Sequence, residues 1–349
     1  MTPKTPDPLV PLVGRLAPSP TGAQHIGNAR TYLLAWLSIR SRGGRLILRM
    51  EDIDSPRIKP GAEQQALDDL QWLGLDWDEG PDVGGPHAPY VQTQRLESYR
   101  AALEQLKTAE QVYPCTCTRS DVVAAASAPH LGQEGPRYLG TCSGRRASDA
   151  EELARMGVAF AWRFRASSIV HELHDLVAGT RRCNVSEELG DFVVAKSDGS
   201  PAYQLAVVLD DRAMGVTEVL RGDDLLPSAF RQLELYRLFS SPHTPCAGAG
   251  TRSVPATIGP AFAHVPLVVG EDGRRLAKRH GDTRISLLRD KQVPAARLVG
   301  LLAWSAGLRQ TTEPLMPREL LADFTLDKLP RQPFVFKAEM LRELLTTQA

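Results

Sequence analysis

Apolar residues in the first hundred positions follow two different spacings. An apolar run over Val10–Ala17 predicts a buried strand, and a second run predicts a strand over Arg45–Met50. Between these runs, apolar residues recur at helical spacing from Ile26 to Leu37, which predicts a helix. Two further helical patterns cover residues 62–73 and 95–111. Strands that alternate with helices in this way are typical of a parallel α/β sheet.

The alternation is interrupted over residues 112–185. This stretch holds three clustered cysteines, a segment rich in Gly, Pro, Ser and Arg at 129–147, and one strand-like run at 161–165. We interpret it as an insertion between two halves of one α/β domain. The α/β pattern then resumes with two strand-like runs in the segment FVVAKSDGSPAY, on either side of a hairpin signal at Asp198-Gly199.

The second half of the chain predicts further helices and a basic loop. Helical patterns near 204–213 and 226–239 flank a strand, and a second hairpin signal at Asp272-Gly273 precedes the loop. The predicted parts of this α/β protein are a flexible tail (1–10), the first half of the α/β domain (11–111), the insertion (112–185), the second half (186–265), the basic loop (266–286) and a C-terminal helical region (287–349).

Composition excludes several classes of protein. Lys plus Arg and Asp plus Glu each total 41, so the net charge is zero, which argues against a protein that binds nucleic acid through bulk positive charge. No apolar run approaches the roughly 18 residues of a membrane span. The proline-rich N-terminus does not resemble a secretory signal, and the odd number of cysteines disfavours a disulfide framework. We therefore expect a cytoplasmic, monomeric protein that is large enough to be an enzyme and has no membrane partner.

Two loops carry residues suited to bind a nucleotide. The first, residues 18–28, joins a predicted strand to a predicted helix, where free N–H groups are available to phosphate. Its His25 is placed to donate to a phosphate oxygen as charge develops in a transition state. The second loop, residues 274–282, places Lys278 where it can neutralise the β- and γ-phosphates. Taken singly, a histidine at a helix start is more often structural, and a basic loop is more often solvated surface.

Three cysteines within 28 positions form a third candidate site. Cys115, Cys117 and Cys142 favour a tetrahedral zinc site, with Tyr138 or His130 as the fourth ligand. The alternative is three reduced, buried thiols. The remaining cysteines, Cys183 and Cys246, lie outside the cluster and are expected to be inert.

The two loops, in this order, resemble the HIGH and KMSKS signatures of class I aminoacyl-tRNA synthetases. HIGN at 25–28 matches the first and RLAKR at 275–279 the second, with Asn28, Arg275 and Ala277 as departures. Three further strings resemble the glutamyl branch of that family: LRMEDID at 48–54, LRGDDLL at 220–226 and FAHVPLVVG at 262–270. The resemblance extends over about residues 12–305, and it implies a Rossmann-type class I synthetase catalytic domain with a zinc-bearing insertion and a short C-terminal helical region.

The resemblance also implies a role for each residue that matches the family pattern. The catalytic residues are His25 and Lys278. The first signature comprises Pro18, Ser19, Pro20, Thr21, Gly22, His25, Ile26, Gly27 and Asn28. The second signature comprises Arg275, Leu276, Ala277, Lys278 and Arg279. Glutamate is bound by Arg15, Leu16, Ala17, Pro18, Ser19, Glu51, Tyr203 and Arg221. ATP, which carries Mg²⁺, is bound by His25, Gly27, Asn28 and Lys278. The ligands of a structural Zn²⁺ are Cys115, Cys117, Tyr138 and Cys142.

Elementary chemistry agrees with the glutamate-binding assignment. Arginine binds a carboxylate bidentately, which lysine cannot do. Arg15 and Arg221 each come at the end of a predicted strand, so we expect both at the same edge of the sheet. Asp223 and Asp224 follow directly, and we expect them to cap the next helix rather than to contact substrate.

Within the glutamyl branch, the chain resembles the family of glutamyl-queuosine tRNA(Asp) synthetases, which are short paralogues of glutamyl-tRNA synthetase. Only about 70 residues follow the second signature, and the cysteine pattern is CxC with YxxxC, as in these paralogues. The resemblance implies tRNA-independent activation of L-glutamate with ATP. The glutamyl group is then transferred to queuosine at the wobble position of tRNA(Asp), and we expect the basic loop and the insertion to face that tRNA.

Three alternatives remain open from the sequence. A shortened glutamyl-tRNA synthetase would share the active site and charge the 3′ end of tRNA(Glu). A catalytically silent tRNA-binding module would keep the fold but would not need the glutamate and phosphate residues in combination. A different nucleotidyltransferase of the same superfamily would not need the two arginines and the zinc set.

Overall fold

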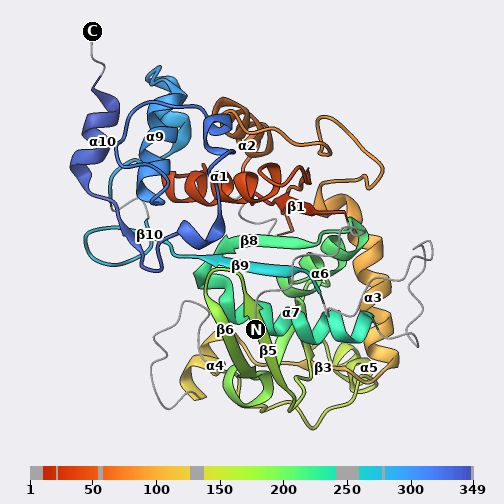
Figure 1. Cartoon of the computed structure of the whole chain (residues 1–349). Coiled ribbons are helices and arrows are strands. Elements are labelled where there is room, and N and C mark those ends of the chain that lie inside the picture. The colour runs from red at the N-terminus through yellow and green to blue at the C-terminus, as the bar shows by residue number, and fades with distance from the viewer. Residues whose placement is uncertain are drawn as a thin grey trace.

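The computed structural model of the chain describes residues 11–20, 23–53, 58–125, 137–240, 259–276 and 280–346. Two pairs of parallel strands form its centre. Strand β1 (Val13–Leu16) pairs with β2 (Arg45–Leu48), and β8 (Glu218–Gly222) pairs with β9 (Ala261–Val265). The two pairs meet where the Thr217 N–H donates to the Val13 carbonyl at 2.8 Å, and β1 lies beside β8 (Figure 1). The α/β fold class is confirmed.

Alternation along the strands sends neighbouring residues to opposite faces of this sheet. One face packs against α1 (Ile26–Arg40) and α9 (Ala295–Ser305), and the other packs against α6 (Tyr203–Ala213) and α7 (Leu226–Phe239). The strands place Leu16, Leu48, Leu220 and Val265 on the first face. They place Val13, Ile47, Val219 and Phe262 on the second. By the same alternation, Arg15, Arg221 and His264 share the second face, beneath α6 and α7.

Helix α1 follows the predicted apolar pattern closely. Its buried residues include Ile26, Leu33 and Trp36, all at the helical spacing seen in the sequence. Its buried Arg30 donates to the Pro266 carbonyl at 2.7 Å, and so joins the helix to the second half of the sheet. The two helical patterns that follow it in the sequence correspond to α2 (Ala62–Trp72) and α3 (Leu96–Thr108).

Antiparallel strands replace the α/β pattern from residue 112. Strands β3 (Val112–Cys115), β4 (Ala161–Phe164) and β7 (Phe192–Ala195) form one sheet in the order β3-β4-β7. Strands β5 (Val170–Asp175) and β6 (Gly179–Asn184) form a separate antiparallel hairpin that the sequence pattern did not predict. Because β7 pairs with β4, strand pairing crosses the boundary after residue 185, where we placed the end of the insertion. Two short helices, α4 (Arg119–Ala125) and α5 (Asp149–Arg155), complete this part of the chain.

The two predicted hairpin turns are present, but one expected strand is not. The Lys196 N–H donates to the Ser200 carbonyl at 2.8 Å across the first turn, and Gly270 donates to Arg274 at 2.9 Å across the second. After the first turn, only Pro201 pairs with β7. The expected strand through Tyr203 is wrong, because Tyr203 begins α6.

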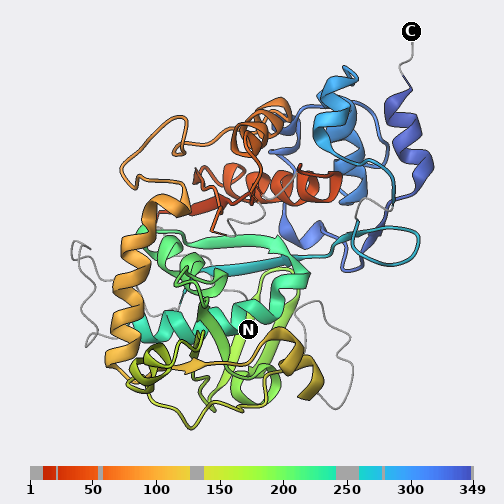
Figure 2. The ribbon, with the colours of Figure 1, turned by 180° about the vertical axis from the view of Figure 1, so that it is seen from behind.

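The C-terminal region is helical only in part. Helices α8 (Ile285–Asp290), α9 and α10 (Ala338–Leu345) are joined by irregular chain that contains 3-10 turns and the short strand β11 (Phe334–Val335). This strand pairs in parallel with β10 (Val268–Val269), so the C-terminal region contains a short strand in addition to the expected helices. Figure 2 shows this region on the α1 side of the molecule.

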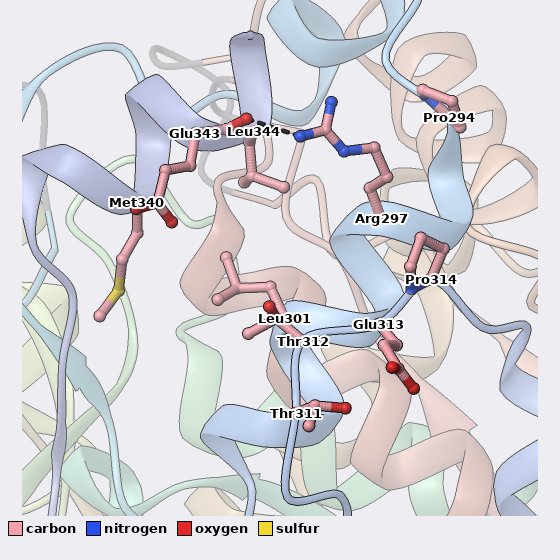
Figure 3. Close-up of a pocket in the computed structure, with 10 residues that line it drawn as sticks. All are labelled: Pro294, Arg297, Leu301, Thr311, Thr312, Glu313, Pro314, Met340, Glu343 and Leu344. Atoms are coloured by element: carbon pink, nitrogen blue, oxygen red, sulfur yellow. Dashed lines mark hydrogen bonds between the residues drawn. The ribbon is translucent and has the colours of Figure 1, made fainter. Parts of the chain in front are cut away.

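A cavity of about 430 Å³ lies between α9, α10 and residues 311–314. Figure 3 shows Arg297 of α9 reaching across it, where its guanidinium donates to the Glu343 carbonyl at 2.6 Å and so holds the end of α10. Among the described residues, none of those predicted to bind glutamate, ATP or zinc lines this cavity. Among the described ranges, no helix combines the length and the apolar character needed to cross a bilayer.

Candidate active site

The imidazole of His25 is fixed at the N-terminus of α1. Its Nδ1 accepts a hydrogen bond from the Asn28 N–H at 3.3 Å, and Asn28 Oδ1 accepts one from the His25 N–H at 3.2 Å. This reciprocal cap satisfies two backbone donors of the helix start. Because Nδ1 is an acceptor, the neutral ring carries its proton on Nε2. The departure of Asn28 from the signature therefore provides the cap that orients His25.

His25 is neutral at physiological pH. Burial, and after it the positive charge of Arg275, lower the pKa of His25 from 6.5 to about 4. The ring is thus a hydrogen-bond donor through Nε2 rather than a cation. A neutral donor of this kind suits a phosphate whose charge is balanced by other groups.

Backbone pairing joins the first signature to the residues that follow the second. The Ile26 N–H donates to the Thr283 carbonyl at 3.0 Å, and the Ile285 N–H donates to the Gln24 carbonyl at 2.9 Å. On the other side of the second signature, the buried Leu276 donates to the Val268 carbonyl at 3.2 Å. Ala277, Lys278 and Arg279 lie outside the described residues. The chain on both sides of Lys278 is therefore anchored beside His25.

Arg275, the first residue of the second signature, pairs with Asp224. Their Nη1 and Oδ2 atoms are 2.9 Å apart. The expectation that Asp223 and Asp224 cap the next helix is wrong, because α7 has Leu225 at its N-cap and no side chain caps it. Asp224 instead links the end of β8 to the basic loop.

The turn of the first signature is tied to the segment after β2. The Glu51 N–H donates to the Pro18 carbonyl at 3.0 Å, and the Arg49 N–H donates to the Leu16 carbonyl at 2.9 Å. These bonds run along the carboxyl ends of β1 and β2, so Glu51 lies beside the turn. Ser19 is exposed, Ala17 is half-buried, and Pro18 and Pro20 are buried; Thr21 and Gly22 lie outside the described residues.

Gly27 allows a close approach between the start of α1 and β10. A Cβ atom at Gly27 would lie 3.0 Å from His25 Cε1 and 3.5 Å from Val268 Cβ. A larger side chain would therefore displace the imidazole or the strand.

Arg15 and Arg221 are buried on the same face of the sheet, with 6% and 4% of their surfaces exposed. The Arg221 Nη1 donates to the Tyr203 hydroxyl at 3.3 Å. Arg15 Nε lies 3.6 Å from the Asp211 carboxylate, and among the described residues no atom accepts a hydrogen bond from this nitrogen. A buried guanidinium N–H without an acceptor is costly unless a ligand supplies one. Arg15 thus fits the role of a carboxylate-binding residue.

Tyr203 and Glu51 complete this group. Burial raises the pKa of Tyr203, while Arg221 and Arg15 act to lower it and Glu51 acts to raise it. The fields of three other predicted glutamate-binding residues therefore reach the Tyr203 hydroxyl. Burial also raises the pKa of Glu51, against the opposing charges of Arg49 and Arg15. The structure brings all four side chains together.

A buried ionic network that the sequence did not reveal supports these residues. Arg49 is fully buried and donates to Glu51 at 2.9 Å and to Asp211 at 2.7 Å. Asp210, also fully buried, accepts from the Tyr99 hydroxyl at 2.8 Å and from Arg95 Nε at 2.7 Å. A single sequence offers only a weak signal for this network, namely a charged residue directly after an apolar strand and an Asp pair on an apolar helix.

Tyr32 of α1 is a second residue that sequence reasoning missed. Its hydroxyl donates to Gln24 Oε1 at 3.1 Å. Burial raises the pKa of Tyr32, and the charges of Glu51, Arg275 and Arg15 also act on it. The charges of two predicted glutamate-binding residues and of the first residue of the second signature therefore reach the Tyr32 hydroxyl.

The predicted zinc ligands converge at the end of β3. The Cys117 and Cys142 sulfurs are 3.7 Å apart, and the Tyr138 hydroxyl lies 3.5 Å from Cys115 Sγ and 3.9 Å from Cys117 Sγ. All three sulfurs lie within 4.8 Å of one another. Zinc–sulfur bonds of about 2.3 Å in a tetrahedron place the sulfurs about 3.8 Å apart, so the group fits a tetrahedral metal site. His130, the alternative fourth ligand, lies outside the described residues, as does Cys246.

The position of Tyr138 is set by its neighbours. Its hydroxyl accepts from the Cys142 N–H at 2.7 Å, and the Arg163 guanidinium lies 3.8 Å from the centre of its ring. Gly190 has a φ of 72°, and a Cβ there would lie 2.5 Å from the Tyr138 carbonyl oxygen. Although burial acts in the opposite direction, hydrogen bonds from Thr116 and Tyr138 lower the pKa of the Cys142 thiol to about 7, which favours the thiolate that a metal requires. Cys183, one of the two cysteines expected to be inert, is buried and is not part of this cluster.

Comparisons with known proteins agree over nearly the whole chain. The family of class I tRNA synthetases (E and Q), catalytic domain, matches residues 11–343. The glutamyl-Q tRNA(Asp) synthetase of Symbiobacterium thermophilum is 48% identical over 336 residues, which cover 95% of this chain and 98% of that protein. Glutamate–tRNA ligase 2 of Syntrophus aciditrophicus is 38% identical over 328 residues, which cover 94% of this chain but 64% of the ligase. The crystal structure of a glutamate tRNA ligase from Elizabethkingia meningosepticum superposes with a TM-score of 0.76 at 27% identity, covering 95% of this chain and 68% of that one.

Proposed function

The chain belongs to the class I tRNA synthetases of the E and Q type, and from this premise we propose that it activates L-glutamate with ATP and transfers it to queuosine in tRNA(Asp). The name of the 48% identical relative supports the acceptor, because the match covers almost all of both chains. Relatives named as glutamate–tRNA ligases match at lower identity and over a smaller share of their own length.

One observation carries the chemical part of the proposal. The hydrogen bond from Ile26 to Thr283 joins the first signature to the chain that follows the second, and the bond from Leu276 to Val268 joins the second signature to β10, which lies next to Gly27. Beside them lies the group that we propose to bind glutamate, which comprises the buried Arg15, Glu51 and Arg221 and the half-buried Tyr203. A protein that only bound tRNA would need none of these buried groups in combination.

The residues suggest how activation proceeds. An oxygen of the glutamate α-carboxylate attacks the α-phosphorus of ATP, and the bond between that phosphorus and the bridging oxygen breaks, which releases pyrophosphate. Such a step depends on positioning and on charge neutralisation rather than on a protein nucleophile. His25 donates through Nε2 to a phosphate oxygen, and Lys278 neutralises the departing pyrophosphate. Mg²⁺ accompanies ATP as part of the substrate.

Arg15, Arg221, Tyr203 and Glu51 select the amino acid. The two guanidinium groups supply bidentate donors for carboxylate oxygens, and Glu51 supplies the negative charge that an ammonium group requires. Arg15, Arg221 and Glu51 are buried, and a site with little water strengthens the interactions of their charged groups.

The cysteine cluster has a structural role in this proposal. Cys115, Cys117, Tyr138 and Cys142 would hold Zn²⁺, which would tie β3 to the chain at 138–142. The cluster forms its own small core with Tyr113, separate from the group around Arg15.

Glutamate-dependent exchange between ATP and pyrophosphate, measured without tRNA, tests the activation step. Exchange without tRNA is the expected result. Exchange that appears only after tRNA(Glu) is added would favour a glutamyl-tRNA synthetase, and no exchange under either condition would leave a silent tRNA-binding module. Lys278→Ala is expected to abolish exchange while glutamate binding is retained.

Transfer of radiolabelled glutamate tests the acceptor. We expect label on tRNA(Asp) that contains queuosine and none on tRNA(Asp) that contains unmodified guanosine at the same position. Label on the 3′ end of tRNA(Glu) would contradict the proposed acceptor.

A further inference from the structure

The guanidinium of Arg221 has a histidine as a hydrogen-bond acceptor. Arg221 and His264 are direct partners in the parallel pair β8–β9, and Arg221 Nε donates to His264 Nε2 at 3.0 Å. Both side chains are buried. Because an arginine N–H only donates, His264 Nε2 must carry no proton in this arrangement.

An aspartate from another part of the chain fixes that state of the histidine. The His264 Nδ1–H donates to Asp175 Oδ2 at 2.6 Å, and the His264 backbone N–H donates to Asp175 Oδ1 at 3.0 Å. Asp175 also accepts from the N–H groups of Val177 and Ala178, at 2.9 and 2.6 Å. Because the Asp175 oxygens accept all of these hydrogen bonds, the carboxylate is ionised, and it keeps the proton of the His264 ring on Nδ1.

We infer that His264 and Asp175 are positioning residues that orient the Arg221 guanidinium for glutamate. The inference rests on the proposed function, in which Arg221 binds the substrate. It assigns to the His264–Asp175 pair a role that acts through Arg221 and involves no contact with substrate.

The remaining contacts of Arg221 show why its orientation depends on this pair. Nη1 donates to the Tyr203 hydroxyl and Nη2 to the Leu225 carbonyl, each at a longer distance of 3.3 Å. The ring of Phe262 lies 5.3 Å from the Arg221 guanidinium carbon and stacks on His264 with an interplanar angle of 13°. Nε therefore makes the shortest of the three hydrogen bonds of the Arg221 guanidinium. Its acceptor, His264 Nε2, sets the orientation of the guanidinium plane.

The pair also brings the β5–β6 hairpin into the site. Asp175 ends β5, and the Leu176 N–H donates to the Phe262 carbonyl at 2.8 Å, so the hairpin turn is fixed to β9. This hairpin belongs to the segment that we predicted as an insertion. Through Asp175 and His264, that segment therefore contacts Arg221 on the side that we propose faces away from the substrate. This contact is separate from the cysteine cluster.

Steady-state exchange kinetics of matched variants test the inference. In His264→Leu the acceptor of Arg221 is lost, and in Asp175→Asn an amide donor faces the histidine and favours the tautomer with Nε2–H, which opposes Arg221. We expect each to raise the KM for glutamate about tenfold or more, with the KM for ATP nearly unchanged. His264→Gln keeps an acceptor oxygen near the position of Nε2, so its glutamate KM should rise less than that of His264→Leu.

His171 provides the control for simple loss of a buried histidine. It lies on the same hairpin and pairs with the buried Glu234 at 2.9 Å, but no contact with Arg221 is recorded for it in the described structure. His171→Leu should lower the melting temperature about as much as His264→Leu and leave the glutamate KM unchanged. An equal rise of glutamate KM in both variants, or an unchanged KM in His264→Leu, would overturn the inference.

The tautomer of His264 gives a readout that needs no activity. Nitrogen-15 NMR of labelled histidines should show Nδ1–H in the wild type and a shift toward Nε2–H in Asp175→Asn. A wild-type protein without glutamate-dependent exchange would refute the proposed function alone, whereas an Nε2–H tautomer in the wild type would refute the positioning role whatever the activity.

Discussion

The guanidinium of Arg49 donates to the Glu51 carboxylate at 2.9 Å, on the same side of the sheet as the two substrate arginines. Arg49 has no exposed surface, and its guanidinium forms ion pairs with three carboxylates, those of Glu51, Asp210 and Asp211. The residues that we propose to bind glutamate are therefore supported by a buried ionic network whose members depend on one another.

Replacing Arg49 should destabilise the protein strongly. Arg49→Met would leave buried carboxylates without their counter-ion, and we expect the free energy of unfolding to fall by about 3–5 kcal/mol. Chemical denaturation monitored by circular dichroism measures the change. Arg318→Met removes an exposed pair with Asp76 and should cost less than about 1 kcal/mol. Equal losses in the two variants would show that the network contributes no more than a surface pair.

Loss of either substrate arginine should affect glutamate far more than ATP. Arg15→Ala and Arg221→Ala each remove a buried donor to a carboxylate, and we expect the glutamate requirement to rise roughly 30-fold or more. Exchange kinetics at varied glutamate give the value. Arg45→Ala is the control, because Arg45 lies at the opposite end of β2 and is partly exposed. Wild-type kinetics in both site variants would refute the assignment.

The pKa of His25 gives stability a defined dependence on pH. The folded pKa is about 4 and the ordinary value is 6.5, so the unfolded chain takes up a proton first as the pH falls. The contribution of His25 is complete above about pH 6.5 and is lost progressively as the pH falls toward 4. His25→Asn keeps a good N-cap but does not titrate in this range, so its free energy of unfolding should fall less between pH 7 and pH 5. Parallel curves for the two proteins would contradict the lowered pKa.

Arg275 should tune the same imidazole. Its positive charge is the second cause of the low pKa of His25, after burial. Arg275→Ala is therefore expected to raise the His25 pKa while leaving it below 6.5, as measured by NMR titration of the ring protons. An unchanged pKa would mean that Arg275 exerts no field at His25 in solution.

The cysteine cluster should hold one metal ion per chain. Cys142→Ser removes the sulfur that lies 3.7 Å from Cys117, and we expect loss of bound zinc and a lower melting temperature. Elemental analysis and thermal unfolding measure both. Cys183→Ser, outside the cluster, should retain the zinc. If chelation abolished exchange while the fold and the melting temperature stayed intact, the structural role would be wrong.

The sequence predicted the parts of the fold whose apolar residues repeat regularly. Helix α1 was predicted from apolar residues at helical spacing and strands β1, β2 and β8 from short apolar stretches, and the structure contains each of them. Strand β5 was missed because two of its three buried positions are occupied by His171 and Asp175 rather than by apolar side chains. Buried and exposed residues alternate along β5 as in any half-buried strand. Hydrophobic and polar residues do not alternate in the same way, so the sequence gives no strand signal.

The candidate site was predictable only where a residue matched a known motif. His25, Arg15 and Arg221 stand in recognisable strings, and the structure places them at the carboxyl ends of neighbouring strands or at the helix that follows. Asp211 and Asp175 stand in no such string. Their importance arises from long-range contacts, to Arg49 and to His264, that local spacing along a chain does not encode.

The pairing of Ile26 with Thr283 has a consequence for how the protein matures. A catalytic centre whose two halves lie so far apart along the polypeptide is assembled late, because the entropy of closing a long loop opposes early contact. On the ribosome, the segment around His25 emerges first. Most of the remaining sequence must be translated before the segment around Thr283, with which it pairs, is available. Truncated translation products that stop before Thr283 would therefore contain His25 but would lack the backbone pairing beside it.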